Sequence, residues 1–213
     1  DIPTWQRLTG THAIQLAIEG SSPRPTLEDL SNDPHFKGRL IVDVTEGLFF
    51  SNAPHNSESP NKNIQYYHDR TPAQRASFQL NRILESGLVL LDKDHLSLNA
   101  QLDALEIPSR EGVFMMPIFP MDFGYCTFDR QVYMTDRFMA DTNLQNQVKG
   151  IWYFFSQGRK GAPPMPAEEL AAILQSAKDA TDKIKARGGE VLFVRTPSSN
   201  PMLAGENMAF PRA

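Results

Sequence analysis

A glycine–serine turn near the start of the chain carries the residue types best suited to chemistry. Gly20, Ser21 and Ser22 follow an aliphatic run at residues 14–18, which predicts a buried strand, and a helix-start pattern comes next. Open α/β sheets bind ligands at the turns that follow their strands, so a hydroxyl in this turn is a candidate nucleophile. The alternative for Ser21 and Ser22 is a capping role at the helix that follows.

Three more polar side chains follow predicted strands. Glu46 comes just after an aliphatic run at 40–44, and Ser198 and Asn200 come after another at 191–194. The carboxyl ends of parallel strands meet at one edge of a sheet, so we expect these side chains to line one cleft with the glycine–serine turn. The alternatives are a helix cap or salt bridge for Glu46 and turn formation for Ser198 and Asn200.

Strands and helices are predicted to alternate around these residues. The clearest unit begins at Pro166, carries acidic residues in its first turn, ends at Gly188 and leads into a strand. Thr71 is the predicted N-cap of another helix. Predicted strands are 14–18, 40–44 and 191–194; predicted helices are 25–30 with Thr26 as N-cap, 72–86, 97–105, 143–156 and 166–187; residues 51–69 are predicted as an exposed loop and 113–123 as an edge strand or extended segment. This order predicts one α/β domain over residues 1–213, a three-layer α/β/α sandwich with a mostly parallel sheet.

Composition excludes several classes of function. A formal net charge of -4 and a pI near 5.7 provide no basic surface for nucleic acid or for an anionic membrane. Cys126 is the single cysteine, which rules out an internal disulfide and an all-cysteine zinc site. No apolar run in residues 1–213 reaches the roughly 18 residues that a membrane-spanning helix needs.

Two further groups of side chains admit a functional and a structural interpretation. His55 and His68, with Glu58 and Asp69 nearby, fit no recognised metal-ligand spacing, so we predict solvated loop histidines and no metal or cofactor. The aromatic run at 152–155 suits a sugar-binding platform, but packing of one helix face on the sheet is the preferred interpretation.

Three stretches of the chain, 15–23, 40–50 and 189–197, resemble the SGNH (GDSL-like) hydrolases. The resemblance is closest to a bacterial branch that is often carried behind an N-terminal membrane anchor. It implies a flavodoxin-like three-layer sandwich and serine nucleophile chemistry on a small-molecule or glycan ester or O-acyl group. It also implies a location in the cell envelope, periplasmic or extracytoplasmic, with the anchor outside the residues shown.

Few of the family's functional residues carry over to this sequence. Gly20 matches the glycine whose backbone N–H helps to stabilise the oxyanion, but residues 45–47 lack the family's asparagine. Asp92 and His95 match the family's Asp-x-x-His, yet a helix and a strand still follow them, so a solvated loop is the preferred interpretation. We expect the family's catalytic triad to lie outside the residues shown, with the first strand and the C-terminal catalytic block.

Two function hypotheses follow, with a third behind them. The first is an SGNH-like hydrolase or acyl-transfer protein that acts on an ester. The second is a non-catalytic envelope binding domain of the same fold. The third is a nucleotide-binding flavodoxin-like domain, which residues 20–23 disfavour because they form neither a Walker A nor a Gly-x-Gly-x-x-Gly pattern.

Overall fold

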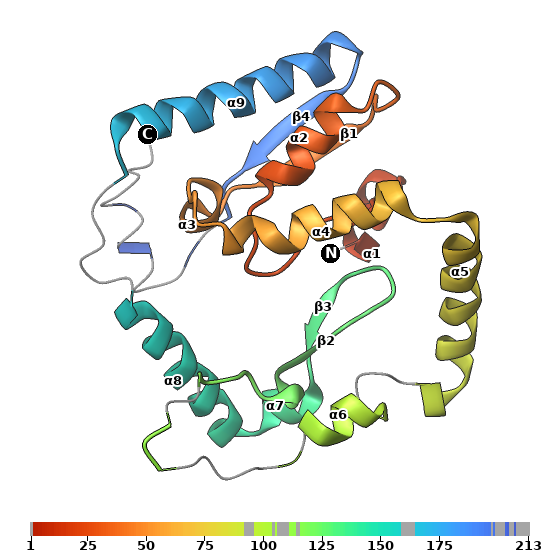
Figure 1. Ribbon diagram of the computed structural model, residues 1–213, viewed down its shortest axis with the longest axis vertical. Helices are drawn as coiled ribbons and strands as arrows, with labels where there is room; N and C mark the ends of the chain where they lie inside the picture. The colour runs from red at the N-terminus through yellow and green to blue at the C-terminus, as the bar shows by residue number, and fades with distance from the viewer. Residues whose placement is uncertain are drawn as a thin grey trace. The chain divides into compact units, whose positions relative to one another are not determined.

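The computed structural model of the chain forms two compact units. It describes residues 2–91, 96–103, 105, 111–113, 116–158, 165–196, 198, 203–204 and 207 (Figure 1). Unit 1 comprises Asp1–Gln15 and Thr71–Pro163, and unit 2 comprises Leu16–Arg70 and Pro164–Ala213. The prediction of a three-layer sandwich is wrong, because the described residues are mostly helical and form two sheets of two strands each.

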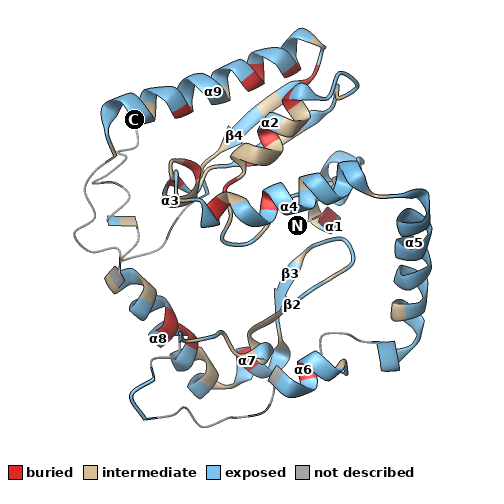
Figure 2. Cartoon of the chain, viewed as in Figure 1, coloured by how far each residue is buried: buried red, intermediate tan, exposed pale blue. Residues whose placement is uncertain are grey.

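Unit 2 is built on a pair of parallel strands, β1 (Arg39–Asp43) and β4 (Glu190–Val194). Both strands were predicted, and the structure confirms them and pairs Leu40 with Val191. Helices α2 (Arg24–Asn32) and α9 (Ala167–Ala186) pack against each other, and their apolar side chains join those of β1 in one core. The buried members of this core are Leu27, Val42, Phe49, Ile173, Ala180 and Ile184. Figure 2 shows the buried residues of α2, α3 and α9 in red.

The predicted helix and strand at the end of unit 2 are confirmed as α9 and β4, and the structure shows the local features behind that prediction. Glutamates occupy the first turn of α9 and lysines the last, which suits the helix dipole at both ends. Gly188 follows with a φ of 88°, a left-handed conformation that favours glycine at a helix end. At Gly189 a Cβ would lie 2.7 Å from Cγ2 of Ile184, so the tight turn needs a second glycine. Pro166 is the N-cap of α9, one position before its predicted place.

Residues 51–69 do not form the predicted loop. After α3 (Glu46–Phe49), the chain forms α4 (His55–Asp69), a helix with no strong apolar stripe. Glu58 and Lys62 pair at 2.5 Å one turn apart, and the hydrogen bond from Lys62 lowers the pKa of the Glu58 carboxyl. Asn56 and Pro60 are buried, and α4 packs against α2. Tertiary contacts therefore override the polar, proline-containing composition on which the loop prediction rested.

The predicted strand at residues 14–18 is also wrong. These residues lie in neither of the two sheets that the structure describes, and the side chain of Ile14 is 79% exposed. An aliphatic run favours a strand only where a partner strand satisfies its backbone groups. The helix at 25–30 is confirmed as α2, but Thr26 lies inside it, and Pro23 is the N-cap.

The described part of unit 1 consists of helices of varied length and a hairpin. The strands β2 (Gly124–Cys126) and β3 (Val132–Met134) pair antiparallel, with Tyr125 opposite Tyr133. The predicted helices at 72–86, 97–105 and 143–156 are confirmed as α5, α6 and α8. The helical elements are α1 (Ile2–Thr9), α5 (Pro72–Gly87), η1 (Val89–Leu91), α6 (Leu98–Asp103), η2 (Met121–Phe123), α7 (Asp136–Ala140) and α8 (Thr142–Gly158). No helix among the described residues is both long and apolar enough to cross a membrane.

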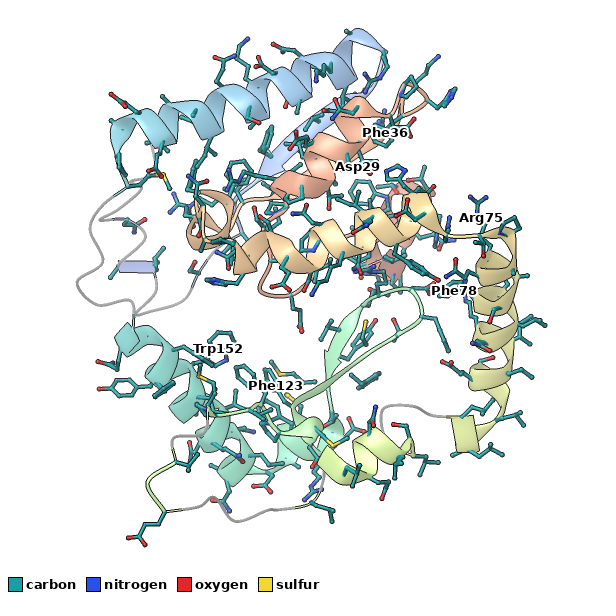
Figure 3. All side chains as sticks on the ribbon, in the orientation of Figure 1. Asp29, Phe36, Arg75, Phe78, Phe123 and Trp152 are labelled. Carbon is teal, nitrogen blue, oxygen red and sulfur yellow. The ribbon has the colours of Figure 1, made fainter. Side chains whose placement is uncertain are left out.

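The aromatic residues of α8 do not pack on a sheet as predicted. Trp152, labelled in Figure 3, is 56% exposed. Its ring centroid lies 5.1 Å from that of Phe119. Phe119 stacks on Phe123, and Phe123 meets the buried Phe138 of α7 edge to face. Aromatic contacts with Phe119, together with packing against η2 and α7, therefore hold α8, and Val148 and Ile151 are buried in it.

The capping box of α5 yields a first testable prediction. Thr71 Oγ1 accepts a hydrogen bond from the Gln74 N–H at 3.3 Å, and Gln74 Oε1 accepts one from the Thr71 N–H at 2.7 Å. We expect Thr71→Ala to destabilise α5 by about 1 kcal/mol and to accelerate amide exchange in α5 roughly fivefold. Ser77→Ala, a change in the middle of the same helix, is the control and should leave exchange within twofold of wild type. Equal effects of the two changes would contradict the capping role.

Candidate functional site

The glycine–serine turn is fixed by backbone hydrogen bonds within unit 2. The Ser21 N–H donates to the Ile18 carbonyl at 3.2 Å and closes the turn. Ser22 is only 2% exposed, and its N–H donates to the carbonyl of Asn56 at 2.8 Å. Asn56 is the second residue of α4, the helix that follows α3 in the chain. The turn is therefore attached to the start of α4.

Gly20 presents an open backbone N–H in this turn. Its φ of 64° is a left-handed conformation that an L side chain adopts only with strain, and a Cβ built there would meet nothing within 4 Å. Gly20 is exposed, and no acceptor among the described residues takes a hydrogen bond from its N–H. A donor with this freedom can approach an oxygen that gains negative charge, as the predicted oxyanion role requires.

The two serine hydroxyls of the turn are engaged locally. Ser21 Oγ donates to the Glu19 carbonyl at 3.3 Å, and Ser22 Oγ accepts a long hydrogen bond of 3.4 Å from the N–H of Arg24, the first residue of α2. In the part of the chain that the structure describes, neither hydroxyl forms a hydrogen bond with a histidine. The described turn therefore holds a hydroxyl and an open donor, but no base that would activate Ser21.

Arg24 joins the turn to the segment after α3. Its Nη2 donates to the carbonyl of Ser51 and to Oδ1 of Asn52, the latter at 3.1 Å. The Asn56 side chain donates to Ser51 Oγ at 2.8 Å and closes the loop around residue 51. Partial burial lowers the pKa of the Arg24 guanidinium, because desolvation disfavours its charged form.

Glu46 takes the structural role that was its alternative interpretation. It lies buried in the first turn of α3, just after β1, and forms an ion pair with Arg195, just after β4. Thr196 Oγ1 donates to Asp43 Oδ1 at 3.3 Å across the same strand ends. The carboxyl ends of β1 and β4 do lie together at one polar edge of the sheet, as predicted. The Glu46 carboxylate at that edge is paired with Arg195.

The remaining predicted site residues add little to this arrangement. Ser198 is described and half-buried after β4. Asp92, His95 and Asn200 lie outside the described residues. No hydrogen bond or ion pair between described residues joins Ser21 to Glu46.

The histidines of α4 lie on a helix rather than in a loop. His68 Nε2 contacts Oδ1 of Asp29 in α2 at 2.7 Å (Figure 3 labels Asp29). Among the described residues, no three side chains of the His, Cys, Asp and Glu types come close enough together to hold a metal ion. The contact of His68 with Asp29 therefore joins two helices.

Sequence reasoning missed three residues of this region: Arg24, Asn56 and Arg195. Arg195 follows a predicted strand directly, so its place at the strand end was available as a signal. Arg24 and Asn56 carry no such signal, because their partners become neighbours only in the folded unit. Comparison with known proteins adds no relative: no protein-family model, no curated protein and no solved structure matches this chain.

Proposed function

We propose that the chain acts on an ester or O-acyl group at the Gly20–Ser22 turn, by serine nucleophile chemistry. The observation that supports it most is the open N–H of Gly20, in a left-handed turn that Ser22 anchors to the start of α4. The resemblance to SGNH hydrolases assigns this same glycine to the oxyanion site. Geometry and resemblance therefore point to one atom, the backbone nitrogen of Gly20.

The chemistry proceeds in two balanced halves. A serine hydroxyl attacks the carbonyl carbon, its proton passes to a general base, and the carbonyl oxygen becomes an oxyanion that the Gly20 N–H stabilises. Collapse of this intermediate expels the alcohol, which takes the proton, and water then hydrolyses the acyl-serine in the same way. Ser21 is the hydroxyl nearest to Gly20 in sequence and is the candidate nucleophile among the described residues.

Gly20→Ala tests the oxyanion role, with p-nitrophenyl acetate as substrate. A methyl group at a φ of 64° introduces strain of about 1 kcal/mol or more and turns the N–H away from its donor position. Loss of one oxyanion donor lowers kcat by roughly 100-fold, so we expect a fall of that order with KM little changed.

Gly112→Ala is the matched control. Gly112 has a φ of 80°, and a Cβ there also meets nothing within 4 Å, but it lies in unit 1. It should keep wild-type kcat. A wild-type rate in Gly20→Ala, or an equal loss in both variants, would contradict the assigned role.

A binding function without turnover is the second candidate. It is favoured by the local hydrogen bonds that engage both serine hydroxyls of the turn. In that case the chain would not hydrolyse p-nitrophenyl acetate, and an uncleaved ester such as triacetin would raise the Tm of wild type through preferential binding to the folded state. The Gly20→Ala variant would lose this shift.

A further inference from the structure

The Gly20–Ser22 turn depends on side chains that lie outside it. Ser22 and Asn56 are both buried, and the 2.8 Å bond from the Ser22 N–H to the Asn56 carbonyl anchors the turn to the start of α4. The Asn56 N–H in turn donates to the Ala53 carbonyl at 3.0 Å, and its side chain donates to Ser51 Oγ at 2.8 Å. The position of the Asn56 carbonyl is thus set by the 51–56 segment.

Arg24 contacts the 51–56 segment at its first two residues. One guanidinium nitrogen, Nη2, serves two acceptors, the Ser51 carbonyl and Asn52 Oδ1. Asn52 also contacts α9, because its Nδ2 donates a hydrogen bond to Glu169 Oε2 at 3.0 Å. Arg24 itself is the first residue of α2, separated from the turn by Pro23 alone. The turn, the 51–56 segment and the start of α9 therefore share one hydrogen-bonded network.

We propose that Arg24 and Asn56 are positioning residues that set the direction of the Gly20 N–H. The inference rests on the proposed function of that N–H as an oxyanion donor. Arg24 holds the 51–56 segment, Asn56 holds Ser22, and the bond from the Ser21 N–H to the Ile18 carbonyl closes the turn around Gly20. Neither side chain is assigned a contact with substrate, so each acts through the backbone of the turn.

The proposal predicts that the shape of the Arg24 head matters more than its charge. A guanidinium presents several donors in a fixed plane, whereas an ammonium is a single compact charge. Arg24→Lys keeps the charge, but its shorter side chain and tetrahedral ammonium do not bring a nitrogen to the place where Nη2 meets both acceptors. Asn56→Asp keeps the size and the backbone carbonyl of residue 56 but removes the donor to Ser51 Oγ.

Two measurements on the full chain separate positioning from general stability. The first is amide exchange at Ser22, resolved by NMR or by fragmentation mass spectrometry. The second is inactivation by a fluorophosphonate, with the maximal rate separated from the half-saturating concentration. Arg39→Lys is the control, because Arg39 is an exposed arginine of the same unit that pairs with Glu190 at the surface.

We expect Arg24→Lys and Asn56→Asp to raise Ser22 exchange about tenfold, as loss of one hydrogen bond of a charged or buried group allows. The maximal inactivation rate should fall roughly 10- to 100-fold through misplacement of the donor, with the half-saturating concentration within twofold of wild type. Arg39→Lys should match wild type in both measurements.

Each other result has a distinct meaning. Wild-type exchange at Ser22 in both variants would overturn the positioning role. Raised exchange with an unchanged inactivation rate would overturn it too, since the turn would be loosened without effect on the reaction. If wild type does not react with the fluorophosphonate at all, the proposed function fails, and exchange at Ser22 alone decides whether Arg24 and Asn56 hold the turn.

Discussion

Replacement of Ile184 by alanine is expected to lower the free energy of unfolding of unit 2 by about 3 kcal/mol. Ile184 is 0% exposed and lies near the end of α9, where its side chain joins the core with Val42 of β1. Gly189 lies close to its Cγ2 atom and carries no side chain that could fill the space. The variant therefore loses both burial and packing contacts.

The measurement must report on unit 2 alone. Both tryptophans, Trp5 and Trp152, belong to unit 1, so their fluorescence follows the other unit. Amide exchange of β1 and β4 under mild urea follows unit 2 directly. Leu174→Ala, on the same helix but at a residue that is 50% exposed, should cost less than about 1 kcal/mol. An equal cost for Ile184→Ala and Leu174→Ala would contradict the assignment of the core.

Glu46→Gln is expected to destabilise unit 2 by a similar amount, about 3 kcal/mol. The substitution removes the negative charge that faces Arg195, while the guanidinium stays largely buried after β4. Without the Glu46 carboxylate, no opposite charge offsets the desolvation of the largely buried Arg195 guanidinium. The ion pair also spans the ends of both strands, so its loss should loosen the parallel pairing itself.

Glu190→Gln is the matched control for this charge. Glu190 pairs with Arg39 at 2.8 Å across the other end of the same two strands, and both side chains are exposed. Exposed pairs contribute about 0–1 kcal/mol, so exchange in β1 and β4 should change little. If Glu190→Gln cost as much as Glu46→Gln, burial would not be the source of the effect.

The elements that the sequence predicted are those with strong local signals. The helix α5 has its N-cap at Thr71, and α9 ends at a glycine in the left-handed conformation. Such signals act within a few residues, so the helix ends that they predict do not depend on which distant segments the helix contacts. The aliphatic runs of β1 and β4 were also predicted as strands, and in the structure the two strands pair with each other.

The wrong predictions concern features that depend on distant partners. Residues 14–18 have the composition of a strand but no place in a described sheet, and the three-layer sandwich was inferred from an alternation of strands and helices that included them. Helix α4 lacks an apolar stripe and is held by contact with α2. Strand pairing and helix packing are settled by the whole unit, which a local pattern does not contain.

The same difference between local signals and distant partners applies to the residues of the candidate site. Gly20 and the polar strand ends were located from the sequence, because turns and strand ends have local signatures. The partner of Glu46 is Arg195, far along the chain, and Arg24 meets Ser51 only after folding. The membership of the SGNH family, the envelope location and the ester substrate stay predictions.

Fluorophosphonate labelling of the full chain, followed by intact mass and peptide mapping, tests the central claim most directly. The account predicts that one serine is phosphonylated, that Gly20→Ala slows the reaction roughly 100-fold, and that Gly112→Ala reacts as wild type does. Absence of labelling on the folded chain, or labelling at the same rate in Gly20→Ala, would contradict ester chemistry at the Gly20–Ser22 turn.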